Sequence, residues 1–294
     1  MHKIAVIGAG TMGNGIAHVF AQYGFPVQLI DLQADQLEKA MAMISKNLER
    51  QVQKGLLAAD EKSNVLKRIQ PVQQIEKGVR QADLIIEAVT ENEEIKLKIF
   101  RELDECALPA AMLATNTSSI SITRIAGATK RPGQVIGMHF MNPVPVMRLV
   151  EVINGYATAP ETTEKIIELC GRIGKTPCVV NDFPGFISNR ILMPMINEAI
   201  ISLQEGVATV ASIDSVMKLG MAHPMGPLQL ADFIGLDVCV AILKVLQDGF
   251  GNPKYAPATL LVNMVAAGNL GVKSGAGFYT YGDHKELIVS KKFK

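Results

Sequence analysis

Apolar runs and helical stretches alternate along the first part of the chain. Residues 3–7 are mostly apolar and end at Gly8, residues 11–23 have the composition of a helix, and residues 27–30 form a second apolar run that ends at Asp31. Short apolar runs bounded by turn residues are typical of buried strands. The pattern predicts a strand, a helix and a second strand, which together form one βαβ unit.

The alternation continues beyond this unit. Residues 35–67 have helical composition with Gly55 as the main breaker, so we expect a helical hairpin inserted after the second strand. Helical stretches at residues 93–105 and 162–173 separate several further apolar runs. These runs cover residues 84–88, 112–115, 135–138, 149–153 and 177–180. Strands that alternate with helices predict an α/β fold with a Rossmann-type, doubly wound and mostly parallel sheet.

The pattern changes at residues 181–185, beyond which we expect no strand before residues 278–281. Helices are predicted at residues 187–203, 211–217, 236–246 and 258–267. The first is apolar on most faces, although it contains Pro194, and such a helix is usually buried. We therefore predict a Rossmann domain over residues 1–183 and an all-helical second domain over residues 184–294, which pairs two chains as a homodimer. A core within one chain would explain the same apolar faces and stays an open alternative.

The charge balance excludes several classes of partner. The 294 residues include 29 Lys and Arg against 28 Asp and Glu, so nothing attracts the chain as a whole to nucleic acid or to an anionic membrane. No apolar run approaches the eighteen or so residues of a membrane span, and the start at Met1, His2 and Lys3 leaves no room for a signal peptide.

The four cysteines form no CxxC pair and have no histidine at metal-ligand spacing. We expect reduced thiols, no metal site and a cytoplasmic location.

A glycine motif joins the first predicted strand to the first helix. Gly8, Gly10 and Gly13, with Thr11 and Met12 before the last of them, form a GxGxxG sequence in the strand–turn–helix context that the motif needs. The first glycine permits the tight turn, the second lets the backbone approach a pyrophosphate, and the third lets helix and strand pack closely. Amide groups at the helix N-terminus then face the phosphates. These residues are predicted to bind a dinucleotide.

Asp31 bears on the choice between the two nicotinamide dinucleotides. It ends the second predicted strand, where a carboxylate can accept hydrogen bonds from the ribose hydroxyls of the adenosine half. It would repel the extra phosphate of NADP, and no arginine follows it immediately, so the sequence favours NAD. The alternative is an ordinary βα turn and an aspartate that caps a strand end. The coincidence of motif, context and acidic residue argues against that alternative.

Polar residues follow several of the predicted strands. Ligands of an open parallel sheet bind past the carboxyl ends of its strands, so we expect these residues at one edge. They are Asp31, Glu91, Asn92, Asn116, Thr117, Ser118, Ser119, His139 and Asn142. Among the five histidines, His139 is the one placed to face a nicotinamide, and Asn116 and Asn142 belong to the same candidate cofactor site.

His139 is the candidate acid–base residue. Oxidation of an alcohol needs a base for the hydroxyl proton, and an imidazole can take up and release a proton near neutral pH. A carboxylate partner would fix the tautomer and stabilise the imidazolium. Glu151, on the next predicted strand beyond a proline-rich turn, is the candidate partner. The alternative is a structural histidine at a strand end, and the sequence leaves it open.

Five segments of the chain carry a family resemblance. They are residues 116–119 (NTSS), 139–151 (HFMNPVPVMRLVE), 185–190 (GFISNR), 224–227 (PMGP) and 273–279 (KSGAGFY). In this order they resemble the motifs of the 3-hydroxyacyl-CoA dehydrogenase family, above all its short bacterial members, and the resemblance covers nearly the whole chain. It implies the reversible, NAD-linked conversion of an (S)-3-hydroxyacyl-CoA, with a short acyl chain such as 3-hydroxybutyryl, to the 3-oxoacyl-CoA in fatty-acid or butanoate-type metabolism.

The resemblance also implies roles for single residues. His139 would be the general base with Glu151 as its partner, and Ser118 and Asn189 would hydrogen-bond the reacting oxygen or the thioester carbonyl. Glu91 and Lys96 match positions that line the NAD site in the family. Because Asn189 lies in the predicted second domain, the family's domain closure would assemble the site from both domains and expel water.

Coenzyme A is a polyanion, so its binding needs local cations. Lys46, Arg50 and Lys54 recur every four residues and would lie on one helix face, for which an ordinary solvated face is the alternative. The resemblance implies that Lys54 contacts the CoA substrate, with Arg50 one turn before it. Two positions depart from the family pattern: Asn47 stands where a serine is usual, and Met141 where a phenylalanine is usual.

Two rival functions fit part of this sequence. A related dehydrogenase of free hydroxy acids or sugar acids would share the two domains but need no CoA site. A non-catalytic NAD-binding protein would keep the glycines and lose the acid–base residues. The joint presence of Ser118, His139, Glu151 and Asn189 argues against the second rival.

Overall fold

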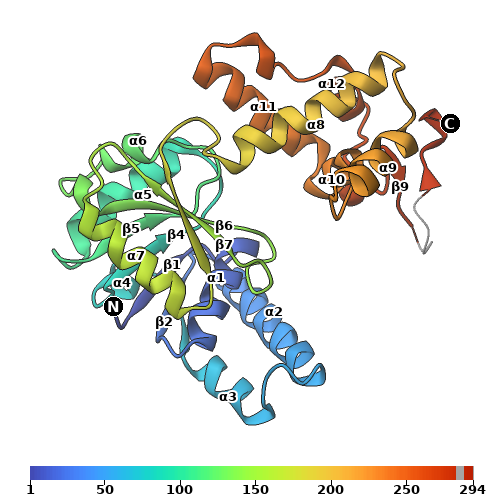
Figure 1. Cartoon of the computed structure of the whole chain (residues 1–294). Coiled ribbons are helices and arrows are strands. Elements are labelled where there is room, and N and C mark those ends of the chain that lie inside the picture. The colour runs from blue at the N-terminus through green and yellow to red at the C-terminus, as the bar shows by residue number, and fades with distance from the viewer. Residues whose placement is uncertain (283–287, 294) are drawn as a thin grey trace. The chain divides into compact units, whose positions relative to one another are not determined.

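The computed structural model describes residues 1–282 and 288–293, and the chain divides into two compact units, Met1–Phe183 and Pro184–Lys294. The first unit is built on an eight-stranded sheet with the order β3-β2-β1-β4-β5-β6-β7-β8 (Figure 1). Its strands are β1 (Ile4–Ile7), β2 (Val27–Ile30), β3 (Ile69–Val72), β4 (Leu84–Glu87), β5 (Met112–Thr115), β6 (Val135–Phe140), β7 (Leu149–Asn154) and β8 (Thr176–Asn181). Neighbouring strands are parallel except β6 and β7. The predicted Rossmann-type, mostly parallel sheet is confirmed.

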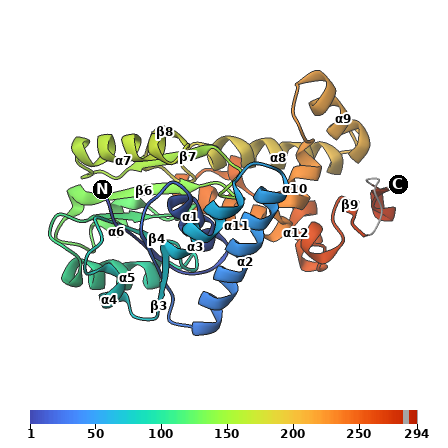
Figure 2. The same cartoon turned by 90° about the horizontal axis from the view of Figure 1, so that it is seen from below.

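Helices cover both faces of this sheet, as a parallel sheet requires. They are α1 (Thr11–Gln22), α2 (Ala34–Gln53), α3 (Ala59–Lys67), α4 (Ile75–Val79), α5 (Glu93–Cys106), α6 (Ile122–Ala126), the short 3-10 helix η1 (Pro132–Gln134) and α7 (Pro160–Arg172). Helices α1 and α7 pack on one face, whereas α4, α5 and α6 lie on the other (Figure 2). The predicted hairpin is formed by α2 and α3, which contact each other and α1. Gly55 takes a positive φ of 69° where α2 ends.

The period of two along each strand decides which face a side chain joins. The apolar cluster beside α1 and α7 includes strand residues Ile86, Ala114, Met138, Phe140, Val150 and Val152. Each polar strand residue of interest is the chain neighbour of one or two of these, so it points to the opposite face. These residues are Glu87, Thr115, His139 and Glu151. The α5 side of the sheet therefore carries a buried polar row near the carboxyl edge of β4, β5 and β6.

Several elements of the first unit differ from the prediction. Strand β3 was not predicted because its sequence is Ile-Gln-Pro-Val with only Ile69 buried, and a proline is tolerated there since β3 is an edge strand. The short helices α4 and α6 were also missed. Strand β6 extends to Phe140, so the expectation that His139 follows the strand is wrong: it is the penultimate residue of β6. Pairing with β7 continues to that point and holds the backbone extended.

The second unit is mainly helical. Its elements are α8 (Ser188–Gln204), α9 (Val210–Gly220), α10 (Pro227–Ile234), α11 (Leu236–Phe250), η2 (Pro253–Tyr255), α12 (Thr259–Ala266), η3 (Val272–Ser274), β9 (Tyr279–Thr280), β10 (Ile288–Val289) and η4 (Lys291–Phe293). Helix α10 was not predicted. The all-helical expectation needs one correction, because β9 and β10 pair as a small antiparallel ribbon. The core joins α8, α10, α11 and α12 around side chains such as Met193 and Leu243 and includes Phe278.

Two buried aspartates hold this unit together. Asp214 accepts hydrogen bonds from the amides of Leu228 and Gln229, at the start of α10, and from the Tyr279 hydroxyl. Asp232 accepts from the amides of Phe278 and Tyr279. A Cβ atom at Gly226 would collide with the Asp214 side chain, and one at Gly277 with that of Asp232. The glycines of the PMGP and KSGAGFY segments thus make room for buried carboxylates.

Candidate active site

The turn after β1 needs glycine at two of its three motif positions. A Cβ atom at Gly13 would overlap the carbonyl oxygen of Gly8, and one at Gly8, which has a positive φ of 98°, would lie 2.6 Å from the carbonyl oxygen of Ala88. A Cβ atom at Gly10 would meet nothing within 4 Å, and helix α1 begins without a side-chain cap. The backbone at Gly10 and the first turn of α1 therefore present amide groups that a phosphate can approach.

Asp31 lies beside this turn. Its Oδ2 accepts a hydrogen bond from the amide of Ala9 at 2.8 Å, and its Oδ1 accepts one from the amide of Gln33 at 3.0 Å. The strand order reverses between β1 and β4, which is where doubly wound sheets bind dinucleotides. The open backbone at Gly10 fits a pyrophosphate and the carboxylate of Asp31 fits ribose hydroxyls, so the residues present fit an NAD molecule.

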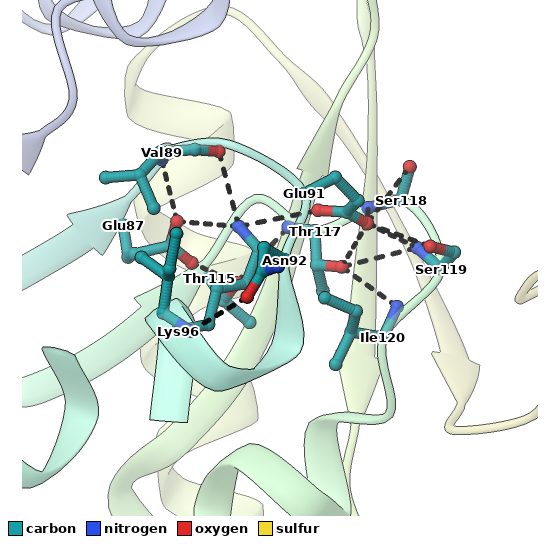
Figure 3. Close-up of polar contacts among 11 residues, drawn as sticks. Glu87, Val89, Glu91, Asn92, Lys96, Thr115, Thr117, Ser118, Ser119 and Ile120 are labelled. Atoms are coloured by element: carbon teal, nitrogen blue, oxygen red, sulfur yellow. Dashed lines mark hydrogen bonds and ion pairs between the residues drawn. The ribbon is translucent and has the colours of Figure 1, made fainter. Parts of the chain in front are cut away.

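A second cluster lies past β4 and β5 (Figure 3). Oε1 of Glu91 accepts hydrogen bonds from the Thr117 hydroxyl (2.6 Å), from the amides of Ser118 (2.9 Å) and Ser119 (3.0 Å), and from the hydroxyls of Ser118 (3.2 Å) and Ser119 (2.9 Å). We call these three residues after β5 the serine turn. Oε2 of Glu91 lies 3.4 Å from Nζ of Lys96.

This environment keeps Glu91 ionised. Burial by itself would raise the pKa of the Glu91 carboxyl, but the charge of Lys96 and the hydrogen bonds from Thr117, Ser119 and Ser118 outweigh burial and lower the pKa. Asn92, the next residue, caps α5 by accepting a hydrogen bond from the amide of Ile95 at 3.0 Å. Glu91 therefore acts as a charged clamp between the start of α5 and the serine turn.

Asn116 connects the end of β5 to the end of β6. Its side-chain Oδ1 accepts a hydrogen bond from the backbone amide of Phe140 at 2.9 Å. The backbone amide of Asn116 donates to the carbonyl of Glu87 at 2.8 Å. Phe140 directly follows His139 in the chain. Asn116 thus fixes the strand end that carries the candidate base.

His139 and Glu151 form a buried pair. Antiparallel pairing of β6 and β7 sets the two residues directly opposite each other. Nδ1 of His139 lies 2.8 Å from Oε2 of Glu151, and the two side chains are 11% and 1% exposed. A carboxylate at Nδ1 selects the tautomer in which Nδ1 carries hydrogen and Nε2 is the basic nitrogen. The arrangement is suited to accepting a proton at Nε2 and stabilising the resulting imidazolium.

A buried lysine anchors the connection between these two strands. Nζ of Lys175 donates hydrogen bonds to the carbonyls of Val144 at 2.5 Å and Met147 at 2.6 Å. On the other side, a Cβ atom at Gly15 in α1 would lie 2.9 Å from Cβ of Val144, so α1 packs closely on the same connection. Burial lowers the pKa of Lys175. The loop that joins His139 to Glu151 is therefore held at Val144 and at Met147.

The remaining predicted residues lie apart from these clusters or in the second unit. Asn142 is exposed and precedes the cis peptide bond to Pro143. Lys46, Arg50 and Lys54 are exposed along α2 and at its C-terminal end. Asn189 is buried in the first turn of α8. The structure thus assembles three groups of the predicted residues in the first unit, namely the glycine turn with Asp31, Glu91 with Lys96 and the serine turn, and the pair of His139 and Glu151. It places the CoA candidates on the hairpin.

Sequence reasoning missed three residues of this region. Glu87 and Thr115 end β4 and β5, and Lys175 directly precedes β8. Their only sequence signal is a charged or polar residue at one end of an apolar run. That signal is weak, because most such residues are solvated strand ends, whereas these three side chains are buried.

The described residues set limits on other kinds of site. Within residues 1–282 and 288–293, no helix has the length and apolar character needed to cross a membrane. The same residues contain no cluster of three or more His, Cys, Asp or Glu side chains that could hold a metal ion. The cysteines Cys106, Cys170, Cys178 and Cys239 are all free thiols.

Comparison with known proteins gives a consistent assignment. The family model described as "3-hydroxyacyl-CoA dehydrogenase, NAD binding domain" matches residues 3–183, and the model of the C-terminal domain of the same family matches residues 185–281. The chain is 54% identical over 279 residues to a 3-hydroxybutyryl-CoA dehydrogenase of Bradyrhizobium diazoefficiens, covering 95% of each protein. It is 52% identical to a probable 3-hydroxybutyryl-CoA dehydrogenase of Bacillus subtilis, covering 95% of this chain and 97% of the relative.

A solved structure agrees in fold over almost the entire length. The crystal structure of (S)-3-hydroxybutyryl-CoA dehydrogenase from Ralstonia eutropha superimposes with a TM-score of 0.93 at 45% identity, covering 96% of this chain and all of the other. Both family models match in the order that the sequence motifs predicted. The chain therefore belongs to the 3-hydroxyacyl-CoA dehydrogenase family.

Proposed function

We propose that this chain is an NAD-dependent dehydrogenase that interconverts (S)-3-hydroxyacyl-CoA and 3-oxoacyl-CoA thioesters, with short acyl groups such as 3-hydroxybutyryl. The buried pair of His139 and Glu151 carries the proposal, because it supplies an oriented base at the edge of the sheet that also holds the glycine turn. Family membership and the activity named for the relatives at 54% and 52% identity support the same reaction.

The cofactor site follows the carboxyl ends of β2, β1, β4 and β5. Gly8, Gly10 and Gly13 form the turn for the pyrophosphate, with the amides of Thr11 and Met12 in the first turn of α1. NAD bound there supplies the hydride acceptor, and NADH the hydride donor. Asp31 would hold the adenosine ribose, whereas Glu91, Lys96, Asn116, Ser118 and Asn142 are the candidates on the nicotinamide side.

His139 moves the proton. In the oxidation direction its Nε2 takes the proton from the oxygen of the C3 hydroxyl, and in the reduction direction it returns a proton to the new alkoxide oxygen. The charge of Glu151 stabilises the imidazolium that forms in between. Ser118 and Asn189 would hydrogen-bond the reacting oxygen or the thioester carbonyl. Asn116 fixes the end of the strand that carries His139, and Lys175 anchors the loop between the two strands.

The hairpin offers a site for coenzyme A. Lys46, Arg50 and Lys54 present an exposed basic face, and no ion pair joins any of them to an acidic residue among those described. An unpaired cationic face suits the phosphates of coenzyme A. Lys54 and Arg50 are the candidate contacts, with the asparagine at position 47 altering the detail of the adenosine end.

Exposed side chains and composition support proposals for the oligomeric state and the location. Large apolar side chains of the second unit are exposed, which is the composition expected of a subunit interface. They include Ile191, Val216, Leu219, Met221 and Phe233. We propose a homodimer through this unit, which a light-scattering mass of twice 31.7 kDa would demonstrate. Four free thiols fit a reducing, cytoplasmic location. The proposed reaction on short acyl-CoA thioesters fits a role in fatty-acid or butanoate-type metabolism.

Steady-state kinetics test the proposed reaction. Acetoacetyl-CoA and longer 3-oxoacyl-CoA thioesters are supplied with NADH and with NADPH. The matched substrates without CoA are free acetoacetate, supplied with NADH, and free hydroxy acids and sugar acids, supplied with NAD because they must be oxidised. We expect rapid oxidation of NADH with acetoacetyl-CoA, much slower reaction with NADPH, and no reaction with free acids. Turnover of the free acids in preference to thioesters would establish the rival sugar-acid activity. NADH binding without any turnover would establish a non-catalytic protein.

A further inference from the structure

A fully buried ion pair lies at the end of β4. Glu87 is the last residue of the strand and is 0% exposed, and Lys96 in α5 is 1% exposed. Nζ of Lys96 lies 2.6 Å from Oε1 of Glu87. Removing two charges from water is costly, and an apolar pair of the same size would usually serve stability equally well. Stability therefore does not explain why the chain has an ion pair here, whereas a role of the pair in the neighbouring site would.

The Glu87 carboxylate is held from every side. Oε1 accepts hydrogen bonds from Lys96 and from the amide of Val89 at 2.7 Å. Oε2 accepts one from the Thr115 hydroxyl at 2.7 Å, and strand register sets Thr115 directly beside Glu87. A carboxylate with this many donors inside the sheet has little freedom to move. Glu87 is thus a rigid anchor point within the fold.

Lys96 connects this anchor to the serine turn (Figure 3). Its ammonium group has three hydrogens and faces three acceptors: Glu87 at 2.6 Å, Glu91 Oε2 at 3.4 Å and the carbonyl of Val89 at 3.5 Å. The other oxygen of Glu91 receives every hydrogen bond from the serine turn described above. A continuous series of ion pairs and hydrogen bonds therefore runs from Glu87, at the C-terminal end of β4, to Ser118.

We propose that Glu87 is a positioning residue for the cofactor site, which acts by holding Lys96 between itself and Glu91. With Glu87 neutral, Glu91 would be the only carboxylate of the described residues that faces the ammonium group of Lys96. The attraction would then draw Glu91 and Lys96 together and loosen Glu91 from the serine turn. The inference rests on the proposed function, since it assigns Lys96, Glu91 and Ser118 to the NAD site.

A double-mutant cycle tests this coupling. NADH dissociation constants are measured by fluorescence titration for the wild type, E87Q, K96M and the E87Q/K96M double variant. We expect E87Q to weaken NADH binding about tenfold to a hundredfold, the range of one hydrogen bond to a charged group. In the K96M background the same substitution should change the dissociation constant less than about twofold, because Glu87 acts through Lys96. If the dissociation constant of the double variant rises by the product of the two single-variant factors, Glu87 and Lys96 act independently and the proposal is overturned.

A control on the same helix separates positioning from stability. Asp104, near the C-terminal end of α5, forms a partly buried ion pair with Arg131 at 2.8 Å. D104N should lower the urea midpoint and leave NADH affinity and the KM for NADH unchanged. E87Q should raise the KM for NADH far more than it changes the KM for the acyl-CoA. If E87Q lowers stability as D104N does and leaves NADH binding intact, Glu87 is structural only.

If E87Q does not fold, a second variant, E87D, still tests the proposal. E87D keeps the negative charge opposite Lys96 but shortens the side chain by one methylene. We expect it to fold and to bind NADH several-fold more weakly than the wild type, and wild-type affinity would overturn the proposal. These titrations need no turnover. A wild-type protein that binds NADH but does not reduce 3-oxoacyl-CoA would refute the proposed reaction while the cycle still tests the positioning of Lys96.

Discussion

Replacement of Glu151 by glutamine isolates the contribution of one charge to catalysis. Glutamine keeps the size and the hydrogen-bonding reach of the side chain, so the buried strand β7 should keep its packing. The contact that changes is the 2.8 Å bond between Nδ1 of His139 and Oε2 of Glu151, both of which are buried. An amide cannot stabilise an imidazolium by charge, and it can present an N–H to Nδ1, which would select the wrong tautomer.

The size of the effect follows from the nature of this bond. A hydrogen bond to a charged group contributes about 1.5–3 kcal/mol, and about 1.36 kcal/mol corresponds to a factor of ten in rate. The charge of Glu151 interacts more strongly with the imidazolium of the transition state than with the neutral ring. Removing this charge therefore raises the activation barrier and lowers kcat. We expect the kcat of E151Q to fall by roughly 10- to 150-fold. NADH affinity should stay within about twofold of the wild type.

Stopped-flow absorbance of NADH at saturating acetoacetyl-CoA measures this loss directly. H139A provides the reference, with an expected loss of about a hundredfold to ten-thousandfold. Residues that act as a unit are strongly non-additive, so E151Q in the H139A background should cost almost nothing further. A near-normal rate in E151Q would remove Glu151 from the mechanism. An equal loss in both backgrounds would show that Glu151 acts on stability or on another step.

Three further outcomes are expected. D31A should lower the preference for NADH over NADPH by about tenfold or more, because it removes the charge that repels the extra phosphate; an unchanged ratio of the two kcat/KM values would contradict this. His18 is fully buried and burial lowers its pKa from 6.5 to about 4, so the fold prefers its neutral form and loses stability as pH falls from 6.5 to about 4. Between pH 7 and pH 4, the free energy of unfolding of the first unit, measured in urea, should therefore fall by about 3 kcal/mol more in the wild type than in H18L. Parallel pH profiles of the two proteins would refute this prediction. K54A should raise the KM for acetoacetyl-CoA about two- to fivefold in a salt-dependent manner, whereas K39A on the same helix, whose lysine already pairs with Asp35 at 2.9 Å, should not.

Local spacing predicted much of the candidate site. The glycines at positions 8, 10 and 13 are recognisable by their spacing. A tight turn at Gly8 and close helix–strand packing at Gly13 exclude a side chain, whereas the open backbone at Gly10 leaves room for a pyrophosphate. The carboxyl edge of the sheet was predictable as well, because strands that alternate with helices are parallel and end at the same side. His139, Glu91 and Asn116 were therefore expected together.

Other features needed the structure because they depend on register and burial. Nothing local distinguishes Glu87 from an ordinary strand end; its significance appears once Thr115 lies beside it and Lys96 of α5 lies over it. Edge strand β3 escaped prediction because its exposed positions carry glutamine and proline, which the apolar pattern of a strand does not include. Lys175 contacts residues far from it in the chain.

By itself, the sequence determined the fold class, the glycine turn, NAD as the cofactor and the family, because each follows from residue types at short, fixed spacing. Tertiary structure alone decided that His139 and Glu151 meet, since only an antiparallel reversal between β6 and β7 sets them opposite each other. It also decided which charges lose their water and must find partners. The physical reason is that spacing along a chain is local, whereas burial and electrostatic pairing depend on how distant segments pack.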